Sequence, residues 1–157
     1  MPLFLRKYVF IAAALFLSTT VHADERYQPI NDKVVSQECG ACHMAFQPQM
    51  LPKKSWRKIM AGLSDHFGED ASVDAATQTR IEKYLVSNAA DSGWRDGKFM
   101  RGLAKGAAPL RITETPRWVR EHNHEIPAGA WKDPKIKSKA NCLACHRRAN
   151  KGDYDDD

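Results

Sequence analysis

Hydrophobic residues recur at helical spacing in three stretches of the chain, and a residue suited to capping a helix precedes each stretch. The candidate caps are Ser55, Asp74 and Thr115, and Pro116 follows Thr115 at the first helical position. The stripes behind them consist of Trp56, Ile59, Met60 and Leu63, then Ile81, Tyr84 and Leu85, and then Trp118, His122 and Ile126. This pattern predicts a mainly α protein.

Shorter elements precede the first stripe. Asn31 or Asp32 is placed to cap a short helix that runs through Val35. The segment 47–52 contains two prolines, so we expect the chain to leave the helix there and form a loop.

His66 extends the first stripe. It lies seven residues after Ile59, which places it within about 20° of the same helical face. We therefore expect the helix to carry His66 and to end at Phe67 and Gly68, where a glycine can adopt a left-handed cap.

The second half of the chain has weaker patterning. Residues 91–108 are rich in glycine, and we expect this connection to pack partly through Trp94 and Phe99. Further on, Ser138 is a candidate cap for a short helix, and the acidic tail from Asp153 to Asp157 is predicted to be solvated and mobile.

The N-terminus has the pattern of a secretory signal peptide. Arg6 and Lys7 precede an apolar run from Tyr8 to Leu17, and Val21-His22-Ala23 follows as a small-residue cleavage signal. The run is ten residues long, whereas a spanning helix needs roughly 20. We expect a cleaved leader and a periplasmic protein without stable membrane insertion, with an uncleaved tether as the alternative.

These boundaries predict a leader over residues 1–23, a first half over 24–90, a connecting segment over 91–110 and a second half over 111–157. The net charge of the full chain is +5, and removal of the leader lowers it by two to +3. A nearly neutral exported protein is not expected to bind nucleic acid.

One pentapeptide pattern occurs twice: Cys39-Gly40-Ala41-Cys42-His43 and Cys142-Leu143-Ala144-Cys145-His146. Two cysteines separated by two residues, with histidine directly after, are the attachment pattern of c-type haem. Each thiol adds to one vinyl group of the porphyrin, and the histidine supplies the proximal ligand of the iron. Both copies together use all four cysteines of the chain, so the sequence predicts two covalently attached haems.

The sixth ligand of the first iron has two main candidates. His66 is favoured because it shares the face of a helix that must pack on the haem. Met50 is the rival, since class I monohaem cytochromes place a methionine ligand on a loop. Met60 is expected to fill the core instead.

The sixth ligand of the second iron has two candidates on one helix. His122 shares the face of Trp118 and Ile126, whereas His124 points about 120° away from Trp118. We favour His122, and His124 becomes an alternative if the helix unwinds before Pro127. Two imidazoles on each iron would leave no open position and would favour low-potential electron transfer.

Other classes of function fit the sequence less well. Zinc sites built from two Cys-x-x-Cys pairs usually separate the pairs by about 15–20 residues, whereas 99 residues lie between Cys42 and Cys142. No βαβ pattern supports a thioredoxin-like protein. A small dihaem peroxidase or a gas-binding haem protein remains the alternative, and it needs an open or methionine-ligated iron.

Several stretches of the chain together resemble the dihaem cytochrome c family, whose members donate electrons to the oxygen-binding sphaeroides haem protein. The matching stretches are Cys39–Phe46, Ser55–Arg57, Leu63–Ser72, Arg111–Thr113, Trp118–His122, Ala140–His146 and Gly152–Tyr154. The resemblance implies a small c-type cytochrome with two haem-centred halves. The first half would resemble a class I cytochrome c, and the second would be an irregular domain of short helices.

The resemblance also implies two bis-histidine haems, with His66 and His122 as the distal ligands. It implies reduction by a quinol-linked membrane cytochrome and delivery of electrons to an oxygen-binding monohaem cytochrome c. The chain is then an electron carrier and not an enzyme. Two basic groups are candidate docking patches for these partners: Lys53, Lys54, Arg57 and Lys58, and Arg147, Arg148 and Lys151.

Overall fold

The computed structural model describes residues 26–155, and they form a mainly helical protein. The four α-helices are α1 (Lys33–Glu38), α2 (Lys53–Ala61), α3 (Ala75–Ser87) and α4 (Pro116–Glu125), and seven single turns of 3₁₀-helix lie between and after them. Within the described residues, extended pairing is limited to two isolated bridges, Arg26–Asp153 and His66–Glu69. The mainly α prediction is confirmed.

Three of the predicted helix caps are confirmed. The side chain of Asp32 accepts hydrogen bonds at the start of α1, and Asp74 does the same at the start of α3. The hydroxyl of Thr115 accepts from the amide of Trp118 at the start of α4, with Pro116 at the first helical position. In each case a short polar side chain satisfies amides that have no partner within the helix.

The predicted cap at Ser55 is wrong. Helix α2 begins at Lys53 directly after Pro52, and Ser55 lies fully buried inside the helix. The first amide of α2, that of Lys53, donates instead to Oδ1 of Asp91 at 2.7 Å. A cap supplied from 38 residues away leaves no local signal in the sequence.

The prediction that His66 lies on the α2 face is also wrong. Helix α2 ends at Ala61 with Gly62 as its C-cap, and one 3₁₀ turn (Leu63–Asp65) separates it from His66. Both Phe67 (φ 59°) and Gly68 (φ 100°) have left-handed backbone angles and form the two-residue turn of the His66–Glu69 bridge. A tight turn, and not a helix, therefore presents His66.

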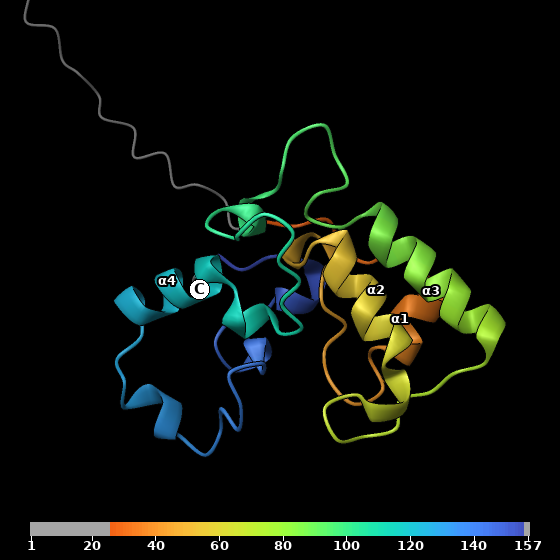
Figure 1. The fold of residues 1–157 in the computed structure, drawn as a ribbon. Coiled ribbons are helices and arrows are strands. Elements are labelled where there is room, and N and C mark those ends of the chain that lie inside the picture. Colours follow the sequence, from red (N-terminus) through yellow and green to blue (C-terminus); the bar gives the residue numbers. More distant parts are fainter. Residues whose placement is uncertain (1–25, 156–157) are drawn as a thin grey trace, which may run out of the picture.

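The first half contains its own apolar core. Seven buried residues from α1, α2, α3 and their connections pack together: Val35, Leu51, Trp56, Met60, Ile81, Leu85 and Ala89. The predicted stripes of α2 and α3 supply most of this cluster, while Ile59 and Tyr84 are only half-buried against it. Figure 1 shows the three helices gathered on one side of the molecule, with α4 on the other.

A second apolar cluster joins the two halves. Its buried members come from the first half, the connecting segment and the second half: Met50, Ala90, Phe99, Trp118, Ala149 and Tyr154. The expectation for the connecting segment is half right, because Phe99 is buried while Trp94 is 88% exposed.

The second half has little regular structure after α4. Cys142–Ala144 forms one turn of 3₁₀-helix, and Asn141 occupies its N-cap position. Ser138 does not cap a helix; its hydroxyl accepts from the amide of Ala140. The tail is also more ordered than predicted up to Asp155, since Asp153 pairs with Arg148 at 3.1 Å.

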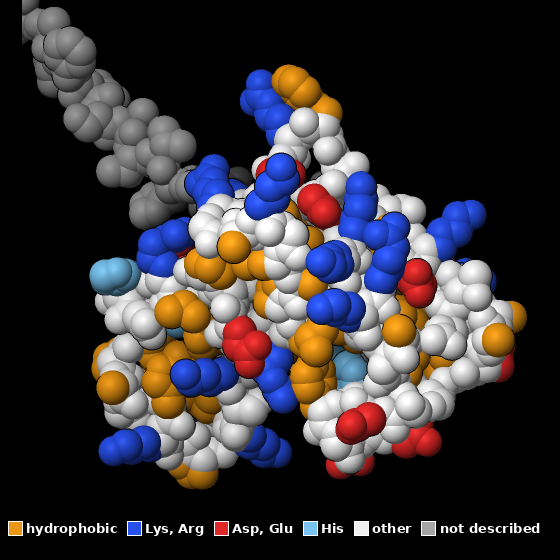
Figure 2. Space-filling model, viewed as in Figure 1, with side chains coloured by type: hydrophobic (Ala, Val, Ile, Leu, Met, Phe, Trp, Pro, Cys, Tyr) orange, Lys and Arg blue, Asp and Glu red, His pale blue; other side chains and the backbone are white. Residues whose placement is uncertain are grey.

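Figure 2 shows Lys and Arg side chains gathered over α2 and over the connecting segment beside it. No helix within residues 26–155 is long and apolar enough to cross a membrane. The predicted leader, residues 1–23, lies outside the described residues.

Candidate functional site

The first Cys-x-x-Cys-His motif follows directly on α1. Cys39 is the C-cap of that helix, and its amide donates to the carbonyl of Val35. A side chain on Gly40 would collide with the carbonyl oxygen of Ser36, because the motif folds back over the last turn of α1. Glycine at this position therefore allows the close approach that aims both cysteines and the histidine.

His43 is held in one orientation by two contacts. Its Nδ1 donates to the carbonyl of Met44 at 2.7 Å, and its ring stacks on Phe46 with centroids 5.0 Å apart. A proton on Nδ1 leaves the lone pair on Nε2, the arrangement in which a histidine binds a metal through Nε2.

The turn at Phe67 and Gly68 brings His66 to His43. The two imidazole centroids are 6.1 Å apart and the ring planes differ by 22°. Partial burial, together with the nearby His43 and Arg111, lowers the pKa of His66. The neutral imidazole, which is the metal-binding form, is therefore favoured. The guanidinium of Arg111 also lies over the ring of Phe67, 4.0 Å from its centroid.

The second motif has a different local structure. The amide of His146 donates to the carbonyl of Cys142 at 2.8 Å, which closes the motif into one turn without a preceding α-helix. The ring of His146 lies 5.4 Å from that of Tyr154. Leu143 is 40% exposed in this motif, whereas the equivalent position of the first motif accepts only glycine.

Helix α4 carries His122 to His146. The two ring centroids are 6.3 Å apart and the planes differ by 79°. His122 stacks on Trp118 at 4.0 Å and 13°, and its Nδ1 donates to the carbonyl of Trp118 at 2.9 Å. Its Nε2 therefore carries the lone pair, as in His43. His124, the alternative, is exposed.

The spacing of both pairs matches two imidazoles on opposite sides of one metal ion. A metal–imidazole bond is about 2.0–2.1 Å, and the ring centroid lies about 1.1 Å beyond the nitrogen, so two such centroids are about 6.3 Å apart. The separations of 6.1 Å and 6.3 Å fit this value. The residues present therefore fit one iron between His43 and His66 and another between His122 and His146.

The methionine candidates lie elsewhere. Met50 is buried in the cluster that joins the halves, with its sulfur 3.9 Å from the hydroxyl of Tyr154. Met60 is buried in the core of the first half, as the sequence predicts.

The cysteines of the two motifs share one arrangement. In each motif the first cysteine is half-buried and the second is exposed. Burial raises the pKa of Cys39 to about 11 and that of Cys142 to about 11. Their surroundings thus favour a neutral sulfur, which is what a thioether bond to haem provides.

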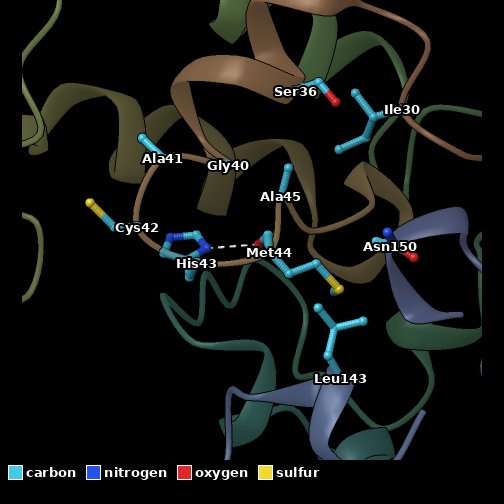
Figure 3. Close-up of a pocket in the computed structure, with 10 residues that line it drawn as sticks. All are labelled: Ile30, Ser36, Gly40, Ala41, Cys42, His43, Met44, Ala45, Leu143 and Asn150. Carbon is cyan, nitrogen blue, oxygen red and sulfur yellow. Dashed lines mark hydrogen bonds between the residues drawn. The ribbon is translucent and has the colours of Figure 1, made fainter. Parts of the chain in front are cut away.

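Both motifs border one pocket of about 450 Å³. Figure 3 shows His43 of the first motif and the adjacent Met44 on one side, and Leu143 and Asn150 of the second half on the other. The two attachment sites are therefore neighbours.

The fold and the two motifs define a small haem protein with two c-type centres. The family model described as dihaem cytochrome c matches residues 35–154. The chain therefore belongs to the dihaem cytochrome c family of electron-transfer haem proteins, and its cofactors are two c-type haems.

Solved structures agree with this family. A dihaem cytochrome c from Rhodobacter sphaeroides is 44% identical, with a TM-score of 0.76, and the match covers 81% of this chain and 99% of that one. A second structure, a crystal structure of DHC purified from Rhodobacter sphaeroides, is 42% identical, with a TM-score of 0.67, and the match covers 80% of this chain and 98% of that one.

A dihaem cytochrome of type c from Shewanella baltica OS155 is 38% identical, with a TM-score of 0.65, and the match covers 78% of this chain and 86% of that one. No curated protein matches the chain.

Sequence reasoning did not find several residues that shape the sites. The contact of Phe46 with His43 and that of Tyr154 with His146 carry no spacing signal. The sequence does indicate the contact of Trp118 with His122, because an i, i+4 pair on a helix lies on one face.

Proposed function

We propose that this protein is an exported electron carrier in which both irons have two histidine ligands. His43 and His66 would hold the first iron, and His122 and His146 the second. Cys39 and Cys42, and likewise Cys142 and Cys145, would form the thioether bonds. The observation that carries the proposal is the separation of the paired rings, 6.1 Å and 6.3 Å.

Such ligation suits electron transfer. The haem iron supplies a one-electron couple, and two imidazoles leave it low-spin with no open position. The chain's part is to hold each imidazole in place in both oxidation states. The carbonyls of Met44 and Trp118 do this for His43 and His122 by fixing the Nδ1 proton.

The family resemblance supports a proposal for the donor and the acceptor, and the leader pattern supports one for the location. We propose a periplasmic protein that receives electrons from a quinol-linked membrane cytochrome and passes them to an oxygen-binding monohaem cytochrome c. The leader pattern before Asp24 supports export, because c-type haem is attached on the outer side of the bacterial inner membrane.

The docking surface for an acidic partner would be the outer face of α2. Arg57 and Lys58 are exposed there, while the ammonium of Lys54 donates to the carbonyl of Gly106 at 3.0 Å. In the second candidate patch, Arg148 already pairs with Asp153. The α2 face therefore has more charge available for steering a partner.

The ligation is tested by low-temperature EPR of the oxidised protein, and the ring planes predict two distinct low-spin signals. An imidazole donates π density into the iron d orbital perpendicular to its own plane. Planes 22° apart act on one d orbital and separate the d levels, whereas planes 79° apart act on two and leave them close in energy. The second centre should therefore have the larger maximum g value.

The competing function is a haem enzyme or gas-binding protein with an open iron. It predicts a high-spin ferric signal and carbon monoxide binding to the reduced protein. Either result would overturn the bis-histidine assignment at the centre concerned. A single low-spin signal typical of histidine–methionine ligation would overturn it as well.

The docking face is tested by Arg57→Glu with Lys58→Glu. The rate of electron transfer to an oxygen-binding monohaem cytochrome c should fall at low salt, and the difference from the unchanged protein should shrink as salt screens the charges. The matched control is Lys132→Glu with Lys135→Glu, which changes the net charge equally at exposed positions of the second half. Equal slowing by both pairs would show that the α2 face is not a specific docking surface.

A further inference from the structure

A buried amide connects the segments that follow the two attachment motifs. Gln47 lies four residues after His43 and has no exposed surface. Its Nε2 donates to the carbonyl of Ala149 at 2.8 Å. Its Oε1 accepts from the hydroxyl of Tyr154 at 2.6 Å. Both partners belong to the segment just after His146, so one side chain bonds to the other half twice.

Tyr154 extends this connection to the second centre. Its ring lies 5.4 Å from the ring of His146 and is tilted by 60°, while its hydroxyl points away to Gln47. Tyr154 is 8% exposed, and its hydroxyl donates to Oε1 of Gln47 inside the protein.

The Ala149 end is equally fixed. Ala149 has no exposed surface, and its amide donates to the carbonyl of His146 at 3.0 Å. The carbonyl of the same residue accepts from Gln47. Gln47 therefore reaches His146 along two routes. One runs through Ala149, whose amide donates to the carbonyl of His146, and the other runs through Tyr154, whose ring contacts the imidazole.

Apolar packing alone would not give such a connection. The surrounding cluster contains Met50, Phe99 and Trp118, and apolar contacts are not directional, so these side chains could slide past one another. A buried amide must have both its donor and its acceptor satisfied, and only one register of the two segments does this.

We propose that Gln47 and Tyr154 are positioning residues, a latch that fixes the two haem centres relative to each other. The latch rests on the proposed function in one respect: it sets the geometry across which electrons pass between the haems. The motifs also line a common pocket, so a small shift between the segments would change the spacing of the irons.

The test is reciprocal and uses the full haem-loaded protein. Tyr154→Phe removes the hydroxyl and keeps the ring, and Gln47→Leu removes the amide at similar volume. The readout is the proton NMR spectrum of the oxidised protein, in which each haem's methyl signals report the orientation of its own ligands. We expect Tyr154→Phe to shift or double the signals of the first haem, and Gln47→Leu those of the second.

The matched control is Tyr84→Phe. The hydroxyl of Tyr84 accepts from the amide of Asn31 at 3.1 Å within the first half, so its loss should leave the second haem's signals unchanged. A double-mutant cycle on urea unfolding should also give coupling between Gln47 and Tyr154 of about tenfold in the folding constant.

The proposal is overturned if each variant moves only the haem of its own half, or if the cycle shows no coupling. Should Gln47→Leu fail to assemble, Gln47→Asn shortens the side chain by one carbon and breaks the same contacts, and the same readout applies. The proposed ligation is judged separately, from the EPR spectrum of the unchanged protein, so the two ideas can fail independently.

Discussion

The two histidine pairs have nearly the same separation, yet they are built on scaffolds that have little in common. The first pair belongs to a half with its own core of seven buried residues, drawn from α1, α2, α3 and their connections. The second pair belongs to a half whose buried residues, such as Trp118 and Ala149, share their cluster with Met50 and Ala90 of the first half. The second half therefore depends on the first half for its packing more than the first depends on the second.

The difference shows what the two sites require. A c-type centre with two histidine ligands would require a turn that presents two thiols and one imidazole, and a second imidazole about 6 Å away. At the first site, a helix end and a tight turn supply these groups. At the second site, a single 3₁₀ turn and an aromatic stack on α4 supply them. The chemistry is repeated, while the surrounding architecture is not.

Removal of each attachment site gives the most severe test of this asymmetry. In Cys142→Ala with Cys145→Ala, we expect the first half to stay folded with one haem per chain, because its core does not need the second half. In Cys39→Ala with Cys42→Ala, we expect both centres to be lost, because the second half rests on the first.

The haem count by pyridine haemochrome, far-ultraviolet circular dichroism and EPR together check this prediction. The variant without the second site should keep the low-spin signal with the smaller maximum g value. Equal loss of structure in both variants would show that the halves depend on each other equally.

Exchange of the second residue of each motif is the next test. Gly40→Leu places a side chain against the carbonyl oxygen of Ser36, a backbone atom that cannot move without disrupting α1. We expect a loss of about 3 kcal/mol in the free energy of unfolding. Leu143→Gly removes a side chain that is 40% exposed and should cost about 1 kcal/mol or less.

Urea unfolding of both variants provides the measurement. A small effect of Gly40→Leu would mean that the first motif does not have to fold back over the helix end. The two attachment motifs would then tolerate the same side chains, and the two centres would differ mainly in the elements that carry their distal histidines.

Sequence patterning predicted the parts of the molecule that are governed by local interactions. The caps at Asp32, Asp74 and Thr115 and the stripes of α2 and α3 are local, and they were found. The true start of α2 depends on Asp91, and the presentation of His66 depends on a turn with left-handed backbone at Phe67. Neither leaves a periodic pattern.

The candidate site was predictable to a similar extent. Motif spacing identified both attachment sites, because covalent chemistry fixes the distance between the thiols. The pairing of His66 with His43 was expected for the wrong reason, since the helix that was meant to carry His66 ends at Ala61. Long-range contacts such as that of Gln47 with Tyr154 could not be read from spacing at all.

Substitution of each distal histidine compares the two centres electronically. His66→Met and His122→Met should each raise one reduction potential, by at least about 0.1 V within the about 0.8 V range that axial ligands control. The other potential should stay unchanged. His122→Met should have the weaker ligation, because the ring stack on Trp118 that holds His122 is lost.

Redox titration of each variant, followed in the visible spectrum, measures both potentials. Substitution of the exposed His124 by Met is the matched control and should alter neither. A change of potential in that control would point to His124, and not His122, as the second distal ligand.

The smallest expected difference between the halves is in their sensitivity to acid, because the helices of the two halves have different caps. Burial raises the pKa of Asp32, but the guanidinium of Arg80 and the amides of Val35 and Val34 lower it by more. Hydrogen bonds from Thr77 lower the pKa of Asp74. A lowered pKa in the folded state means that the stabilisation is present above the unfolded value of about 3.9 and is lost as the pH falls below it.

The cap of α4 is the hydroxyl of Thr115, which does not titrate in this range. Between pH 5 and pH 3, amide hydrogen exchange should therefore quicken in α1 and α3 more than in α4. Asp74→Ser keeps a capping oxygen and removes the titration, so the pH dependence of exchange in α3 should flatten while that in α1 persists. Equal quickening in all three helices would mean that acid acts on the haem ligands and not on the caps.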